Sequence, residues 1–146
     1  KGLDILRDYC LSNEISFLHD GTFSNHSTMK EIIKKSINIG REVQIYYIYL
    51  DPLVAWEFTK AREYFEGRNI IKDKFIEQYF HSRENVDRIK QEFGDRVKIH
   101  CILKNKDNKV EEIVLNQPSI DLYLQSKYNK EIIRRYSPEE LSDLLS

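Results

Sequence analysis

Hydrophobic and polar positions in this chain change between helical and strand-like spacing several times, and their order predicts an α/β fold. The short apolar run that begins at Ile15 predicts a buried strand, which ends at Asp20-Gly21-Thr22. A polar loop through Ser27 follows. The first dozen residues are expected to form a helix, because they carry apolar side chains at helical intervals: Leu3, Leu6, Cys10 and Leu11.

The middle of the chain predicts helix, strand and helix in turn. Thr28 and Glu31 have the spacing of a capping box, which predicts a helix from Thr28 that ends before Gly40. The β-branched and aromatic run Val43–Leu50 predicts a strand covered on both faces. Asp51-Pro52 is typical of a helix start, because aspartate caps the helix and proline fits its first turn.

The second half predicts a long helix, a strand pair and two closing helices. After a break at 66–68, the spacing predicts helices over 73–93, 118–128 and 137–145 and strands over 96–104 and 110–115. This order predicts a single domain, residues 1–146, with a mostly parallel sheet and crossover helices. A sheet of so few strands leaves exposed edges, which indicates that further residues belong before Lys1.

Composition narrows the partner classes. The chain has 23 Lys+Arg against 24 Asp+Glu, so it has no general attraction to nucleic acid or to an anionic membrane. Its longest apolar run, near Val43–Leu50, is too short to span a bilayer. Cys10 and Cys101 have no C-x-x-C spacing and are expected to be buried thiols in a reducing cytoplasm.

Asp20 and Thr22 are the first candidate site residues. Ligands of an open α/β sheet bind beyond the carboxyl ends of its strands, where a carboxylate and a hydroxyl can orient a substrate hydroxyl or a phosphate-bound metal. Ser24 and Asn25 could add neutral hydrogen bonds from the same loop. The alternative is a local turn in which Asp20 and Thr22 bond the backbone and Gly21 supplies a positive φ. The residues alone leave both interpretations open.

Three arginines on the helix–break–helix region form the second set of candidates. Arg68 lies at the break, and an arginine on a loop can neutralise the charge of a transferring phosphate. Arg62 is spaced i,i+4 from Glu66, and Arg83 has the same spacing to Asp87. This spacing favours structural ion pairs for Arg62 and Arg83.

The other polar and aromatic residues form no catalytic or metal-binding motif. The sequence has no Ser/His/Asp or Cys/His arrangement and no G-x-x-x-x-G-K-[ST] phosphate loop. No metal site built from protein ligands alone is predicted, because no metal-ligand spacing is shared by His19, His26, His81 and His100. Core packing rather than base stacking is expected of Trp56, Phe58, Tyr64 and Phe65.

Several segments taken together resemble the zeta toxin family. In order and spacing they are Phe17–Ser24, Arg41–Ile45, Asp51-Pro52, Thr59–Glu63 and Glu66–Arg68, and the resemblance spans about residues 3–104. It implies the fold of a P-loop kinase that uses ATP and Mg²⁺ to phosphorylate UDP-N-acetylglucosamine. It also implies a possible protein partner, since many members are paired with a small antitoxin that blocks the nucleotide site.

The resemblance implies roles for particular residues. The family's acidic-Gly-Thr substrate loop falls on Asp20-Gly21-Thr22, so Asp20 and Thr22 would contact the sugar nucleotide. Ser24 stands where members often have an arginine, a departure that bears on which sugar nucleotide is bound. Arg68 corresponds to the nucleotide-facing, transfer-stabilising arginine, and Arg62 or Arg83 is the candidate for a second one.

The family's first strand, its phosphate loop with the lysine, and its catalytic aspartate have no counterpart in these 146 residues. Phosphoryl transfer depends on positioning and charge neutralisation, so the chain alone is not expected to catalyse it. We interpret it as the C-terminal part of a longer kinase, with a substrate loop at 15–25 and an arginine-bearing lid region at 51–93. The alternative is a non-catalytic module that binds a sugar nucleotide or an antitoxin.

Overall fold

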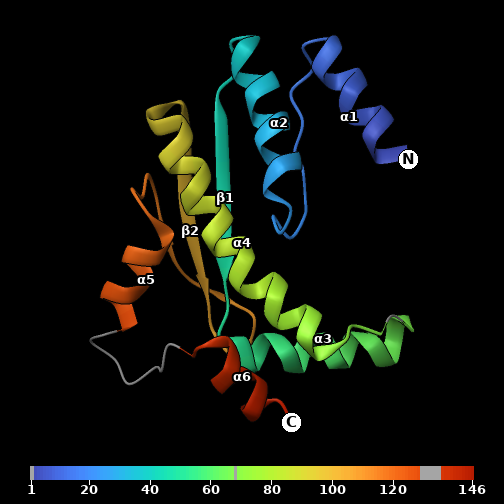
Figure 1. Ribbon diagram of the computed structural model, residues 1–146, viewed down its shortest axis with the longest axis vertical. Coiled ribbons are helices and arrows are strands. Elements are labelled where there is room, and N and C mark those ends of the chain that lie inside the picture. The colour runs from blue at the N-terminus through green and yellow to red at the C-terminus, as the bar shows by residue number, and fades with distance from the viewer. Residues whose placement is uncertain (1, 68, 129–135) are drawn as a thin grey trace.

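A computed structural model describes residues 2–67, 69–128 and 136–146 of the chain, which fold as a small α/β structure (Figure 1). The strands are β1 (Val43–Tyr49), β2 (Val97–Lys104) and β3 (Val110–Val114), and a 3₁₀ turn, η1 (Gly94–Arg96), leads into β2. The helices are α1 (Gly2–Ser12), α2 (His26–Asn38), α3 (Pro52–Glu66), α4 (Lys72–Phe93), α5 (Ile120–Tyr128) and α6 (Pro138–Leu144).

The sheet has three strands in the order β1-β2-β3 and is mixed. β1 and β2 are parallel, with Val43 opposite Val97 and Tyr49 opposite Leu103, and α3 and α4 make the crossover between them. β3 returns antiparallel to β2 through the Asn105–Asn108 turn. The α/β class and the hairpin are confirmed, but only one of the two strand pairs in the described sheet is parallel.

The strand predicted at Ile15 is wrong. The segment between α1 and α2 has no strand pairing, and its amide Ile15 N instead donates to Cys10 O at 2.9 Å, which extends the end of α1. Leu18 is 89% exposed and Ile15 is 44% exposed, so the apolar run is not buried. A strand needs a neighbour for its backbone groups, and this segment pairs with no strand of the described sheet.

The helix starts follow side-chain capping, although one begins earlier than expected. Asp51 Oδ1 accepts from Leu53 N at 2.9 Å, which confirms the start of α3. Ser137 and Glu140 form a complete capping box at the start of α6. The capping box expected at Thr28 is wrong: α2 begins two residues earlier, because Asn25 is the N-cap.

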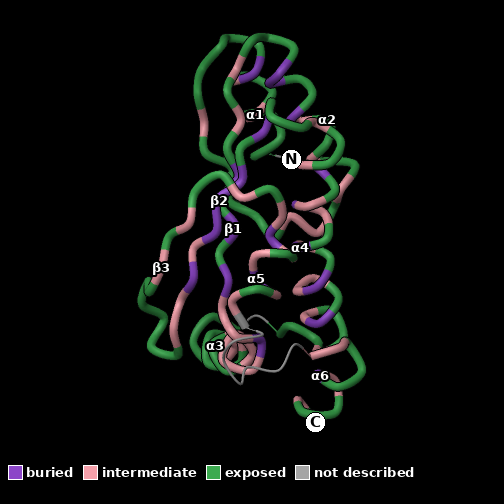
Figure 2. The backbone as a smooth tube through the Cα atoms, turned by 90° about the vertical axis from the view of Figure 1, so that its left-hand side faces the viewer, coloured by how far each residue is buried: buried purple, intermediate pink, exposed green. Residues whose placement is uncertain are grey.

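The described helices cover only one face of the sheet, which contradicts the expectation that β1 is covered on both. α2, α4 and α5 lie on the same side of β1 and β2 (Figures 1 and 2). Ile45, Tyr47 and Tyr49 are buried toward the helices, whereas Tyr46 and Ile48 are 51% and 57% exposed. The strand register places Ile48 beside Ile102 and Ile102 beside Ile113, so an apolar row crosses the open face.

The helices are fixed by two clusters of buried side chains. The larger cluster lies between the sheet and α2, α4 and α5, and a smaller one joins α4 to α6 through Ile76, Phe80 and Leu141. Asp87 of α4 ties down the start of α5, because its carboxylate accepts from Ser119 Oγ at 2.7 Å and from Ile120 N at 2.6 Å. This long α4 therefore organises both ends of the structure.

Candidate functional site

The loop before α2 carries the first candidate residues in a locally bonded turn. Thr22 Oγ1 and Ser24 Oγ lie 2.9 Å apart and share a hydrogen bond. Phe23, between them, has a φ of +57°, in the left-handed region that non-glycine residues rarely adopt. The expectation that Gly21 supplies the positive φ is wrong, because the strained position is Phe23.

Asn85 of α4 holds this loop in place. Its side-chain amide Nδ2 donates to Phe23 O at 3.1 Å and to Ser24 O at 3.0 Å. The Phe23 ring in turn packs against the larger core cluster. The sequence analysis did not select Asn85. The one feature that could have indicated it is its position, as a neutral polar residue beside the buried Val86 on an amphipathic helix.

A cleft of about 550 Å³ lies between the end of this loop and α4. Asn25, His26 and Ser27 at the start of α2 line it, so the positive end of the helix dipole lies beside the same space. Lys74 and Arg88 are the two cations of the lining and Glu77 is its carboxylate, while Arg88 also pairs with Glu92. The lining residues are Ser24, Asn25, His26, Ser27, Lys74, Glu77, Gln78, His81 and Arg88.

Glu92 orients the basic groups at one side of this cleft. Its carboxylate lies 2.8 Å from Lys30 Nζ, 3.3 Å from His26 Nε2 and 3.5 Å from Arg88 Nε. The hydrogen bond from Lys30 holds the pKa of Glu92 below its ordinary value, and the nearby positive charges act in the same direction. The start of α2 is thereby tied to the C-terminal half of α4, and an anion is the ligand class that this electrostatic arrangement suits.

The three predicted acceptor residues take different positions relative to the cleft. Ser24 lines it, whereas Asp20 and Thr22 are exposed and are not among its lining residues. Thr22 is connected to the cleft through its hydrogen bond with Ser24. The loop therefore presents one of the three side chains to the cleft and the other two to solvent.

The arginines are not gathered at this cleft. Arg62 is exposed on α3 and pairs with Glu66 at 3.3 Å, as the helical spacing predicted. Arg83 is buried, and its Nε lies 3.1 Å from Asp121 Oδ1 of α5, so the expected pairing with Asp87 is wrong. The prediction for Arg68 falls outside the described residues.

No phosphate-binding motif or ready-made metal site is found in the chain as described. The 146 residues contain no phosphate-loop lysine motif, and the described ones hold no group of three His, Cys, Asp or Glu side chains placed to bind a metal. Cys101 is buried, as expected, and burial raises the pKa of its thiol to about 12, whereas Cys10 is half-buried. Within the described ranges, no helix has the length and apolar character to cross a membrane.

Comparison with protein families identifies a relationship. The sequence model of the zeta toxin family matches residues 3–116. The chain belongs to the zeta toxin family. This match runs from α1 to just beyond β3, so in this zeta toxin family member α5 and α6 lie outside it. No curated protein and no solved structure matches the chain.

Family membership gives the cleft a functional context. It supports a kinase-like toxin function and nucleotide handling, and it is compatible with a P-loop type of α/β fold. The matched range includes the Asp20-Gly21-Thr22 loop and the residues that line the cleft. It also includes the exposed Arg62 and the buried Arg83. In this zeta toxin family member, the loop–α4 cleft is therefore a polar cavity whose lining lies within the matched sequence.

Proposed function

We propose that the chain carries the acceptor-binding part of a zeta-toxin-like kinase and binds a sugar nucleotide such as UDP-N-acetylglucosamine in the loop–α4 cleft. The observation that carries this proposal is the Asn85 clamp, which holds the Thr22–Ser24 turn at the mouth of a cleft with Lys74 and Arg88 on its wall. The helix start and the two cations suit the diphosphate. Ser24 suits a sugar or ribose hydroxyl.

In this proposal Asp20 and Thr22 contact the acceptor from the exposed side of the turn. Arg68 stabilises the transferring phosphate, and Arg62 or Arg83 provides the second nucleotide contact. ATP and Mg²⁺ are the co-substrates that the family implies, and an antitoxin is the protein partner that it implies. The substrate loop at 15–25 and the region 51–93 then form two parts of one domain in a cytoplasmic enzyme.

A non-catalytic binding module is the second candidate, and the observation behind it is that the 146 residues contain no phosphate-loop lysine motif. Both candidates predict that the 146-residue chain binds UDP-N-acetylglucosamine and transfers no phosphate to it from ATP. Kinase activity regained on adding the family's phosphate-loop segment as a separate polypeptide would favour the kinase. Sugar-nucleotide binding without such activity would favour the module.

Isothermal titration calorimetry with UDP-N-acetylglucosamine tests the proposed site. The Lys74→Gln/Arg88→Gln double variant should bind at least tenfold more weakly, since each charge-assisted hydrogen bond contributes about 1.5–3 kcal/mol. Lys106→Gln is the matched control, because Lys106 is exposed on the β2–β3 turn and does not line the cleft. Equal affinities of the double variant and the wild type would refute the site.

A further inference from the structure

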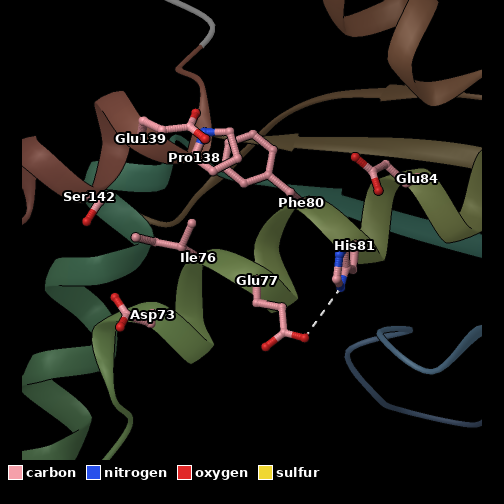
Figure 3. A pocket seen from close by; sticks show the side chains of 9 residues that line it. All are labelled: Asp73, Ile76, Glu77, Phe80, His81, Glu84, Pro138, Glu139 and Ser142. Atoms are coloured by element: carbon pink, nitrogen blue, oxygen red, sulfur yellow. Dashed lines mark ion pairs between the residues drawn. The ribbon is translucent and has the colours of Figure 1, made fainter.

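A second cleft, of about 390 Å³, lies between α4 and the C-terminal helix α6 (Figure 3). α4 supplies one wall and α6 the other, through Pro138, Glu139 and Ser142. Because α6 lies beyond residue 116, this cleft is only partly inside the range that the zeta toxin family model matches. It is therefore a surface that family membership does not explain.

The floor of this cleft is apolar. Ile76 and Phe80 belong to the small cluster that joins α4 to α6, and each keeps one side toward the cleft. Pro138 completes the apolar surface from α6. Ile76 and Phe80 are already only 5% and 9% exposed, so the apolar surface that a partner would newly cover is mainly that of the exposed Pro138.

The rim of the cleft is acidic. Asp73, Glu77 and Glu84 lie at positions i, i+4 and i+11 of α4 and therefore follow one face of the helix beside Phe80 (Figure 3). Glu139 faces them from α6. The lining contains no lysine or arginine, and His81, 3.7 Å from Glu77, is its one basic group.

Within the described ranges, some acidic side chains have a lysine partner and others form no ion pair. Glu63, Glu92 and Glu112 each have a lysine partner. Asp73, Glu84 and Glu139 form no ion pair within the described ranges. The helix dipole accounts for acids in the first turns, where Asp73 and Glu139 lie. It does not account for Glu77 and Glu84, which add like charges to the same face of α4.

We infer that the α4–α6 cleft is a docking site for a basic amphipathic segment of a partner protein. Charge complementarity selects this occupant: Lys or Arg side chains meet the rim carboxylates of Glu84 and Glu139 while an apolar side chain packs on the exposed Pro138. The inference does not depend on the proposed kinase function. Glu77 and His81 also line the loop–α4 cleft, so a docked segment would contact a wall that both clefts share.

Fluorescence anisotropy with a labelled amphipathic peptide of leucine and lysine tests the docking site on the whole chain. The wild type should bind this peptide and should not bind a matched peptide of leucine and glutamate. The Glu84→Gln/Glu139→Gln double variant should bind about fivefold more weakly, because each exposed ion pair contributes modestly. Added salt should weaken binding to the wild type more than to the double variant.

The Glu31→Gln/Glu111→Gln double variant is the matched control, because both residues are exposed glutamates that do not line the cleft. Its peptide affinity should equal that of the wild type. Backbone amide shifts on peptide addition should concentrate at His81 and Ser142. Equal loss in both double variants, or shifts elsewhere, would overturn the inference. The inference would also be overturned if the wild type self-associated and the Glu84→Gln/Glu139→Gln variant did not, because the occupant would then be a second copy of the chain.

Discussion

Replacing Asn85 by alanine tests the clamp between α4 and the candidate substrate loop. The change removes both hydrogen bonds from Nδ2, to Phe23 O at 3.1 Å and to Ser24 O at 3.0 Å. Each neutral hydrogen bond contributes a net free energy of unfolding of about 1 kcal/mol, which gives a loss of about 2 kcal/mol. Alanine is the better helix former and returns about 0.5 kcal/mol. The expected net loss is therefore about 1.5 kcal/mol.

A thermal melt followed by circular dichroism measures this loss. For a chain of this size, about 1.5 kcal/mol corresponds to a fall in Tm of about 3–6 °C. Hydrogen exchange should also become faster in the loop and in the first turn of α2, where Met29 N donates to Asn25 O. Asn38→Ala is the matched control, because Asn38 is an exposed residue at the end of α2. A Tm of Asn85→Ala equal to that of the control, with unchanged exchange in the loop, would refute the clamp.

Two further predictions concern titratable groups. The pKa of Glu92 is lower in the folded state than in the unfolded chain, where it is about 4.3. Ionised Glu92 therefore stabilises the fold above the unfolded-state pKa, and this contribution is lost as the pH falls through the folded-state pKa. NMR titration should show that Lys30→Gln raises this pKa and that Lys34→Gln leaves it unchanged; the same pKa in both variants would contradict the assignment. In the Cys10→Ser variant, iodoacetamide should label Cys101 only after unfolding, because burial raises the pKa of its thiol to about 12. Rapid labelling of the native variant would contradict this burial.

The elements that sequence predicted well are those whose signals are local. Asp51-Pro52 caps and starts α3 within a few residues, and Val43–Leu50 has a strand-forming composition regardless of its neighbours. The strand prediction for the segment from Ile15 failed because an apolar run becomes a strand only where it pairs with another strand, and this segment does not pair with the open edge of β1. Burial of β1 on both faces failed for a similar reason, since coverage depends on where helices pack.

The site was only partly predictable because its decisive contacts join distant residues. Ser24 was predicted from the loop sequence. Asn85 lies 61 positions away and donates to a backbone oxygen, and a pattern of side-chain types cannot indicate a contact with the backbone. Arg83 shows the same limit: its spacing favoured Asp87, yet Asp87 is engaged by the start of α5, and Asp121 becomes the partner. Helical spacing predicts a pair only when tertiary contacts leave both side chains available.

The open face of the sheet has a consequence for how the chain behaves in concentrated solution. Parallel strands are almost always covered on both sides, and here the Ile48–Ile102–Ile113 row faces solvent beside a β1 edge that pairs with no other described strand. An unpaired edge beside an apolar surface is a template for strand addition. Two chains meeting at this edge would extend one sheet and bury the isoleucines together, so colloidal stability should decline steeply as protein concentration rises.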